Sequence, residues 1–322
     1  MRSPSLLALA LMSTLAQATP DIPHWQTAFG LSEAQIRQGH WADQAQQAYD
    51  AAQTASGTAR GALLRQASGL SLLAAHPNRR TPADNQLYAN AAAYYLAAAK
   101  ALGWRTSLLP LIVQGKRVEA LLHLPAKPPT AWLLLLGDVD LSGLEAESWR
   151  QAALEEGWGL LSLDLPGNGA AKELDLDGQP DLVLAASQAL RQQDARRPQL
   201  LVARGWSQPL ALNALLAQDE VAATLLLCPA DLQQPTKLLR LRMGPSAAQA
   251  TAMAQLQQAI SLGEAITSHP LLLVAAPKDP AIHRLMPLSD EAEFLPQSPC
   301  QRDDPQHWRH WLRQQLTRSD RP

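Results

Sequence analysis

The sequence contains little cysteine and few aromatic residues. Of its 322 residues, two are cysteines, Cys228 and Cys300, and 5% are aromatic. Neither a Cys-x-x-Cys pair nor a cysteine–histidine cluster at zinc spacing occurs, so we expect no metal site and no cofactor. In an oxidising compartment the two cysteines could form a disulfide bond, whereas as buried thiols they would serve as small apolar groups.

Charge is also scarce and evenly balanced. Charged residues make up 17% of the chain, and 27 lysines and arginines face 29 aspartates and glutamates, for a formal net charge of −2. No stretch combines clustered basic residues with aromatics, as nucleic-acid-binding surfaces do. We therefore exclude nucleic acid as a partner and expect a small molecule; the sequence does not define the oligomeric state.

Long apolar runs are absent beyond the beginning of the chain. Leu6–Leu15 is mostly apolar, follows Arg2 and precedes Ala16-Gln17-Ala18, which is the order of a secretory signal and its cleavage site. The run is too short to span a membrane, and no later segment is long and apolar enough. We predict a signal peptide over residues 1–18, no stable membrane span, and a mature protein that is exported to the periplasm or secreted.

Two regions with different patterns of apolar residues follow the predicted signal peptide. Alanine, glutamine and leucine recur with a helical period up to residue 103, which predicts three helices over Leu31–Thr54, Thr58–His76 and Asp84–Leu102. We assign residues 19–104 to a helical N-terminal extension and residues 105–322 to a second domain. With 47% hydrophobic residues, the chain can build a sizeable core.

In the second domain, short apolar runs alternate with helical segments. The runs Leu108–Val113 and Val118–Leu124 predict a hairpin, and the later ones predict strands at Trp132–Leu136, Gly159–Leu163, Gln199–Ala203, Ala223–Leu227, Leu271–Ala275 and Glu293–Pro296. Continuous apolar strands separated by helices indicate an α/β fold with a mostly parallel sheet covered on both faces. Ligands bind such sheets beyond the carboxyl ends of the strands.

The segment Gly205-Trp206-Ser207-Gln208-Pro209 follows one of these strands and opens onto a predicted helix. It is similar to the G-x-S-x-G turn that lifts a nucleophilic serine above a sheet, except that Pro209 replaces the second glycine. A serine in such a turn also serves as a helix N-cap. Ser207 is therefore a candidate nucleophile with a structural alternative.

Several further segments resemble the α/β-hydrolase superfamily. They are Leu135–Asp140 after a strand, the loop Asp164–Gly169, the turn at Ser207, and Leu227-Cys228-Pro229. Together with the helical extension, they resemble the group of esterases that includes the fermentation-respiration switch protein. The resemblance implies an α/β-hydrolase fold with a helical cap, which we place at about residues 230–268, and a Ser–Asp–His order of catalytic residues.

On this resemblance, Ser207 would attack, Asp279 would orient the base, and His307 would be the base. Asp279 follows a strand, and its alternative role is to cap the turn that ends at Pro280. Cys300 stands near the place of the family's histidine, so His307 at the start of the last helix takes that role. Its alternative is a solvent-facing position on an amphipathic helix whose tryptophans pack on the sheet.

The oxyanion of an ester hydrolase is held by backbone N–H groups. We assign them to Gln208, which follows the candidate nucleophile, and to Asp138, which follows a strand. Pro209 removes neither donor. The sequence therefore predicts an exported serine carboxylic-ester hydrolase acting on a small or acyl ester. The alternative is a catalytically inactive hydrolase-fold protein that serves as a binding or interaction module.

Overall fold

The computed structural model describes most of the chain. The described residues are 21–76, 81–138, 141–174, 181–217, 221–229, 269–279, 281–297 and 305–319. The predicted signal peptide, the predicted cap at 230–268 and Cys300 lie outside them.

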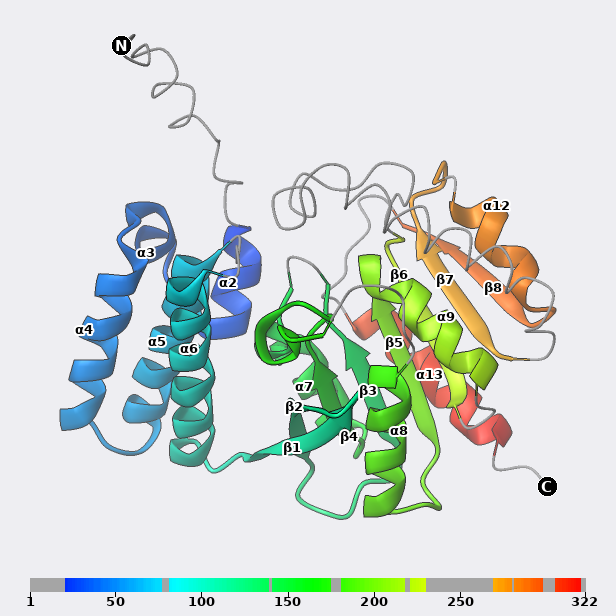
Figure 1. Ribbon diagram of the computed structural model, residues 1–322, viewed down its shortest axis with the longest axis horizontal. Helices are drawn as coiled ribbons and strands as arrows, with labels where there is room; N and C mark the ends of the chain where they lie inside the picture. Colours follow the sequence, from blue (N-terminus) through cyan, green and yellow to red (C-terminus); the bar gives the residue numbers. More distant parts are fainter. Residues whose placement is uncertain are drawn as a thin grey trace, which may run out of the picture.

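Within these ranges, eight strands form one sheet in the order β1-β2-β4-β3-β5-β6-β7-β8 (Figure 1). The strands are β1 (Arg105–Val113), β2 (Lys116–Leu124), β3 (Trp132–Leu136), β4 (Gly159–Leu163), β5 (Gln199–Arg204), β6 (Val221–Leu227), β7 (Leu271–Ala275) and β8 (Ala292–Pro296). β1 and β2 form the predicted hairpin, β2 pairs antiparallel with β4, and the remaining neighbours pair parallel. The predicted fold class, a mostly parallel sheet flanked by helices, is confirmed.

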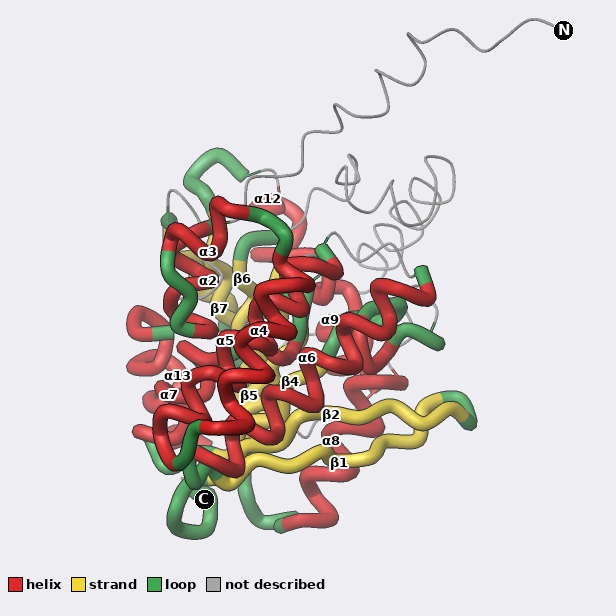
Figure 2. The backbone as a smooth tube through the Cα atoms, turned by 90° about the vertical axis from the view of Figure 1, so that its left-hand side faces the viewer, coloured by secondary structure: helices red, strands yellow, loops and turns green. Residues whose placement is uncertain are grey.

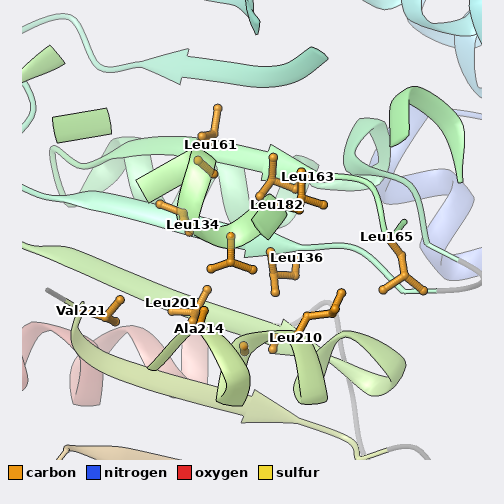
Figure 3. Packing of buried hydrophobic residues seen from close by; sticks show 14 of the residues in the cluster. Leu134, Leu136, Leu161, Leu163, Leu165, Leu182, Leu201, Leu210, Ala214 and Val221 are labelled. Atoms are coloured by element: carbon orange, nitrogen blue, oxygen red, sulfur yellow. The ribbon is translucent and has the colours of Figure 1, made fainter. Parts of the chain in front are cut away.

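Helices cover both faces of the sheet. They are α7 (Glu147–Glu155), α8 (Asp181–Gln193), α9 (Gln208–Ala217) and α13 (Gln306–Ser319). Because side chains alternate along a strand, Leu134 and Leu136 of β3 pack toward α8 and α9 (Figure 3), whereas Leu133 and Leu135 pack toward α7 and α13. Strands buried on both faces must be apolar throughout, as the continuous leucine run of β3 is.

Among the residues that the structure describes, five helices precede the sheet. They are α2 (Ile22–Phe29), α3 (Glu33–Gln38), α4 (Trp41–Thr54), α5 (Gly57–Ala75) and α6 (Pro82–Ala101). Figure 1 shows them as a group beside the sheet, and Figure 2 shows the same group from its outer side. The single helix predicted over Leu31–Thr54 is divided in the structure. Gly39 and His40 have φ of +70° and +51°, and two consecutive left-handed residues cannot continue a right-handed helix.

Buried polar contacts join these helices to the second domain. Arg150 of α7 makes two hydrogen bonds with Glu147, at 2.7 and 2.8 Å, and its guanidinium lies 3.8 Å from the centroid of the Trp104 ring, just after α6. Near the start of α2, His24 Nε2 lies 2.8 Å from Glu145 Oε2. Paired and stacked charges tolerate burial, so these contacts fix the position of the helical extension.

His123 of β2 lies in the same interface. It is buried, its Nδ1 is 2.8 Å from the Thr106 hydroxyl, and its ring meets that of Tyr95 edge-on. Burial first, and the nearby charge of Arg150 second, lower the pKa of His123 from 6.5 to about 3. The side chain is therefore neutral in the folded protein at physiological pH.

This depressed pKa predicts an acid-sensitive stability. Below pH 6.5 the unfolded chain binds a proton at His123 that the folded chain does not, so the free energy of unfolding falls as the pH drops toward 3. The slope reaches about 1.4 kcal/mol per pH unit for one proton. His123→Gln should therefore lose less stability than the wild type between about pH 7 and pH 5 in urea unfolding followed by circular dichroism.

The matched control is His283→Gln, since His283 is exposed. This variant should follow the wild-type pH dependence. If His123→Gln loses as much stability on acidification as the wild type does, His123 is not the group responsible.

Candidate functional site

The turn after β5 is centred on Gly205 rather than on Ser207. β5 ends at Arg204, a short 3-10 helix spans Gly205–Ser207, and α9 begins at Gln208. Gly205 has φ of +52°, a conformation that residues with a side chain rarely adopt. The sharp strand-to-helix turn, which we call the elbow, therefore has Gly205 at its apex.

This placement shifts the register of the motif by two residues. In G-x-S-x-G the serine occupies the strained apex, with small residues two positions before and after it. The corresponding residues here are Ala203, Gly205 and Ser207. Ser207 thus stands at the position of the closing small residue, and the apex position has no side chain.

The Ser207 hydroxyl is hydrogen-bonded to the backbone of the elbow. Its side chain is buried, and Oγ accepts a hydrogen bond from Arg204 N at 2.8 Å and donates one to Arg204 O at 2.9 Å. Neither bond goes to Asp279 or His307. The nucleophilic role of Ser207 stays a prediction, and this geometry favours a structural role in which the side chain holds the turn after β5. It does not show the predicted N-cap, because an N-cap accepts from the N–H groups of the helix that follows.

Asp138 fills the space above Gly205. It follows β3, its N–H donates to Leu141 O at 3.0 Å, and its carbonyl accepts from Asn168 Nδ2 at 3.0 Å. The buried carboxyl group accepts a hydrogen bond from Trp206 N at 3.0 Å. A Cβ added to Gly205 would overlap Asp138 Oδ2, so the aspartate side chain lies where a side chain at the apex would project.

The two predicted oxyanion donors are already used within the fold. Gln208 N–H donates to Gly205 O, and Asp138 N–H donates to Leu141 O. With the register centred on Gly205, the N–H that follows the apex is that of Trp206. An oxyanion would lie about 2.7–3.1 Å from such a donor, and Asp138 Oδ1 stands at that distance from Trp206 N.

Asp279 lies at the carboxyl end of β7, as predicted. It is half-buried, its N–H donates to Ala276 O at 2.9 Å, and its carbonyl accepts from Ile282 N at 3.1 Å. These backbone bonds close a turn around Asp279, and they do not involve its side chain. Whether Asp279 orients a base stays a prediction.

His307 is exposed in the first turn of α13. Its ring lies against that of Trp308, with centroids 5.6 Å apart, while Trp308 and Trp311 are buried in the core. This is the amphipathic arrangement that we considered as the alternative to a catalytic base. The role of His307 as a base also stays a prediction.

Cys228 follows β6, has φ of +52° and is disulfide-bonded. The sequence has one other cysteine, Cys300. Among the residues that the structure describes, no group of three histidine, cysteine or acidic side chains could hold a metal ion. No helix in the same part of the chain is long and apolar enough to cross a membrane.

Comparison with solved structures identifies the class of fold. The chain is similar to 2,6-dihydroxy-pseudo-oxynicotine hydrolase, with 17% identity, a TM-score of 0.72, and coverage of 92% of this chain and 93% of that one. It is also similar to AbyA5, with 16% identity, a TM-score of 0.64, and coverage of 98% and 100%. An esterase of Pyrococcus furiosus, Pf2001, matches with 12% identity and a TM-score of 0.52, over 68% of this chain and 93% of that one.

The chain therefore has the α/β-hydrolase fold. No protein-family model matches the sequence, and no curated protein matches it. At these identities the likeness shows the fold, so the chemistry of the site must be argued from the residues at the elbow.

The crowding at the apex can be tested through stability. Gly205→Ala places a methyl group both at a positive φ and against Asp138. We expect a cost of about 1–2 kcal/mol for the backbone conformation and about 1–3 kcal/mol more for the overlap. The loss in free energy of unfolding, measured by urea unfolding followed by circular dichroism, is the sum of these two costs.

Gly115→Ala is the matched control, because Gly115 has φ of +74° with no atom near its added Cβ. It should show only the backbone cost. In the double variant Asp138→Gly/Gly205→Ala, the two effects should be less than additive, since the overlap is removed. The assignment fails if Gly205→Ala costs no more than Gly115→Ala.

Proposed function

We propose that this chain is a hydrolase-fold protein that binds a small molecule and does not carry out serine-dependent ester hydrolysis. The proposal rests on the hydrogen bond from Trp206 N–H to the Asp138 carboxyl group. This carboxyl group lies over Gly205, the glycine at the apex of the elbow. The sequence also predicts a serine carboxylic-ester hydrolase. The geometry of the elbow favours the inactive alternative.

The chemistry of acyl transfer explains why. It requires a nucleophile, a base within hydrogen-bond reach of it, and free N–H donors for the oxyanion. At this elbow the apex has no side chain, and the Trp206 donor already holds a protein oxygen. An ester carbonyl placed there would have to displace Asp138, which its backbone contacts to Leu141 and Asn168 hold in place.

Ser207 could attack only after a rearrangement of the elbow. Its hydroxyl would have to give up both bonds to Arg204 and turn out of the core. A buried hydrogen bond contributes about 0.5–1.5 kcal/mol, and leaving the Arg204 N–H unsatisfied adds about 1–3 kcal/mol. These costs support a structural role for Ser207.

We also propose that the protein acts outside the cytoplasm, in the periplasm or as a secreted protein. The signal-like segment at residues 1–18 and the disulfide bond at Cys228 support this location, since disulfides persist in oxidising compartments.

The experiment is labelling of the purified protein with a fluorophosphonate probe, which reacts with activated serines. We expect no labelling of the wild type under conditions in which an active serine esterase in the same tube is labelled. Turnover of p-nitrophenyl acetate should equal that of Ser207→Ala, provided that circular dichroism shows the variant to be folded. Labelling of the wild type that Ser207→Ala abolishes would restore the ester-hydrolase interpretation.

A second variant separates a missing nucleophile from a blocked one. Asp138→Ala frees the Trp206 N–H but leaves Ser207 bonded to Arg204. We expect this variant to stay unlabelled as well. Labelling of Asp138→Ala at Ser207 would instead identify an inhibited serine hydrolase and contradict the proposal.

A further inference from the structure

A cleft of about 390 Å³ lies between the helical extension and the second domain. One wall is α6, the other is the β1–β2 hairpin, and the floor is formed by the end of β4 and the segments around Gly143 and Gly169. Figure 2 shows α6 beside this long hairpin. Neither Asp138 nor any residue of the elbow lines the cleft, so it is separate from the site described above.

The walls of the cleft are apolar. α6 contributes Ala89, Ala92 and Ala93, and these side chains are too small to fill the space toward the hairpin. On the opposite wall, Leu108 and Leu121 face the cleft as directly paired residues of β1 and β2. Leu108 is 37% exposed, so a large apolar side chain is available to a ligand.

The floor is polar but internally satisfied. The Tyr88 hydroxyl donates a short hydrogen bond to Asp164 Oδ2, and Asp164 also accepts from Gly143 N at 2.7 Å and Ala170 N at 2.8 Å. Burial first, and the adjacent Asp164 second, raise the pKa of Tyr88, so its hydroxyl stays protonated. Because these groups satisfy one another, the floor does not require a charged partner from the ligand.

Two cationic side chains, Arg117 and Lys172, lie at the mouth of the cleft. Arg117 is paired with Glu119 at 2.9 Å. Lys172 is exposed and, among the described residues, has no ion-pair partner. A ligand whose apolar body contacts the alanines and leucines would therefore place an anionic group near Lys172.

We propose that this cleft binds a small amphipathic anion, an aliphatic carboxylate of medium chain length. Its volume lies within the range of about 300–1,000 Å³ that is typical of small-molecule sites. The apolar walls would bury the chain, and Lys172 would contact the carboxylate. The inference rests on the proposed binding function and gives it a location away from the elbow.

The test is isothermal titration calorimetry of the full mature chain with decanoate, decan-1-ol and decyltrimethylammonium below their micelle concentrations. Decanoate should bind most tightly and the cation most weakly. Ala89→Trp, which fills the cleft from an exposed position of α6, should weaken decanoate binding by at least about tenfold. The control Ala51→Trp, on an exposed position of α4, should bind like the wild type.

Lys172→Gln tests the anionic end of the ligand. It should weaken decanoate binding roughly two- to fivefold, the range of an exposed ion pair, and leave decan-1-ol unchanged. Lys127→Gln, an exposed lysine outside the cleft, is the control. Absence of decanoate binding, equal binding by Ala89→Trp, or an equal preference for the cation would overturn the inference.

This outcome is independent of the labelling experiment. Fluorophosphonate labelling at Ser207 would refute the proposed function whether or not decanoate binds. Failure of decanoate binding in an unlabelled protein would refute only the cleft assignment.

Discussion

The hydrogen bond from Trp206 N–H to the Asp138 carboxyl group determines what this elbow can do. In an active hydrolase this N–H is kept free for the developing oxyanion. Here a protein oxygen occupies it, and the glycine at the apex is what makes room for that oxygen. The two features depend on each other, because any side chain at position 205 would collide with Asp138.

The surrounding structure stabilises this arrangement. The backbone of Asp138 is bonded to Leu141 and to the side chain of Asn168 in the loop after β4. The next residues along that loop reach Asp164, which Tyr88 of α6 contacts. Contacts therefore run from the elbow to the helical extension, and the cleft between α6 and the hairpin lies at the far end of them.

Most of the fold could be predicted from the sequence. Strands such as Trp132–Leu136 are continuous apolar runs, because both faces of the sheet are covered. The break at Gly39 and His40 was missed because alanine- and glutamine-rich flanks keep a helical period on both sides of it.

The site was harder to predict, for a physical reason. A glycine two residues before a serine suggests a nucleophile, yet the pattern does not say which residue takes the positive φ. The best signal was Gly205 itself, since glycine adopts that conformation at low cost. The position of the Asp138 side chain depends on a contact between residues 68 positions apart, which periodicity does not reveal.

A high-resolution crystal structure of the protein tests this account most directly. We expect Asp138 Oδ1 within hydrogen-bond distance of Trp206 N, Gly205 at positive φ, and the Ser207 hydroxyl bonded to the backbone of Arg204. Asp138 turned away from a free Trp206 N–H, with Ser207 directed toward His307, would contradict it.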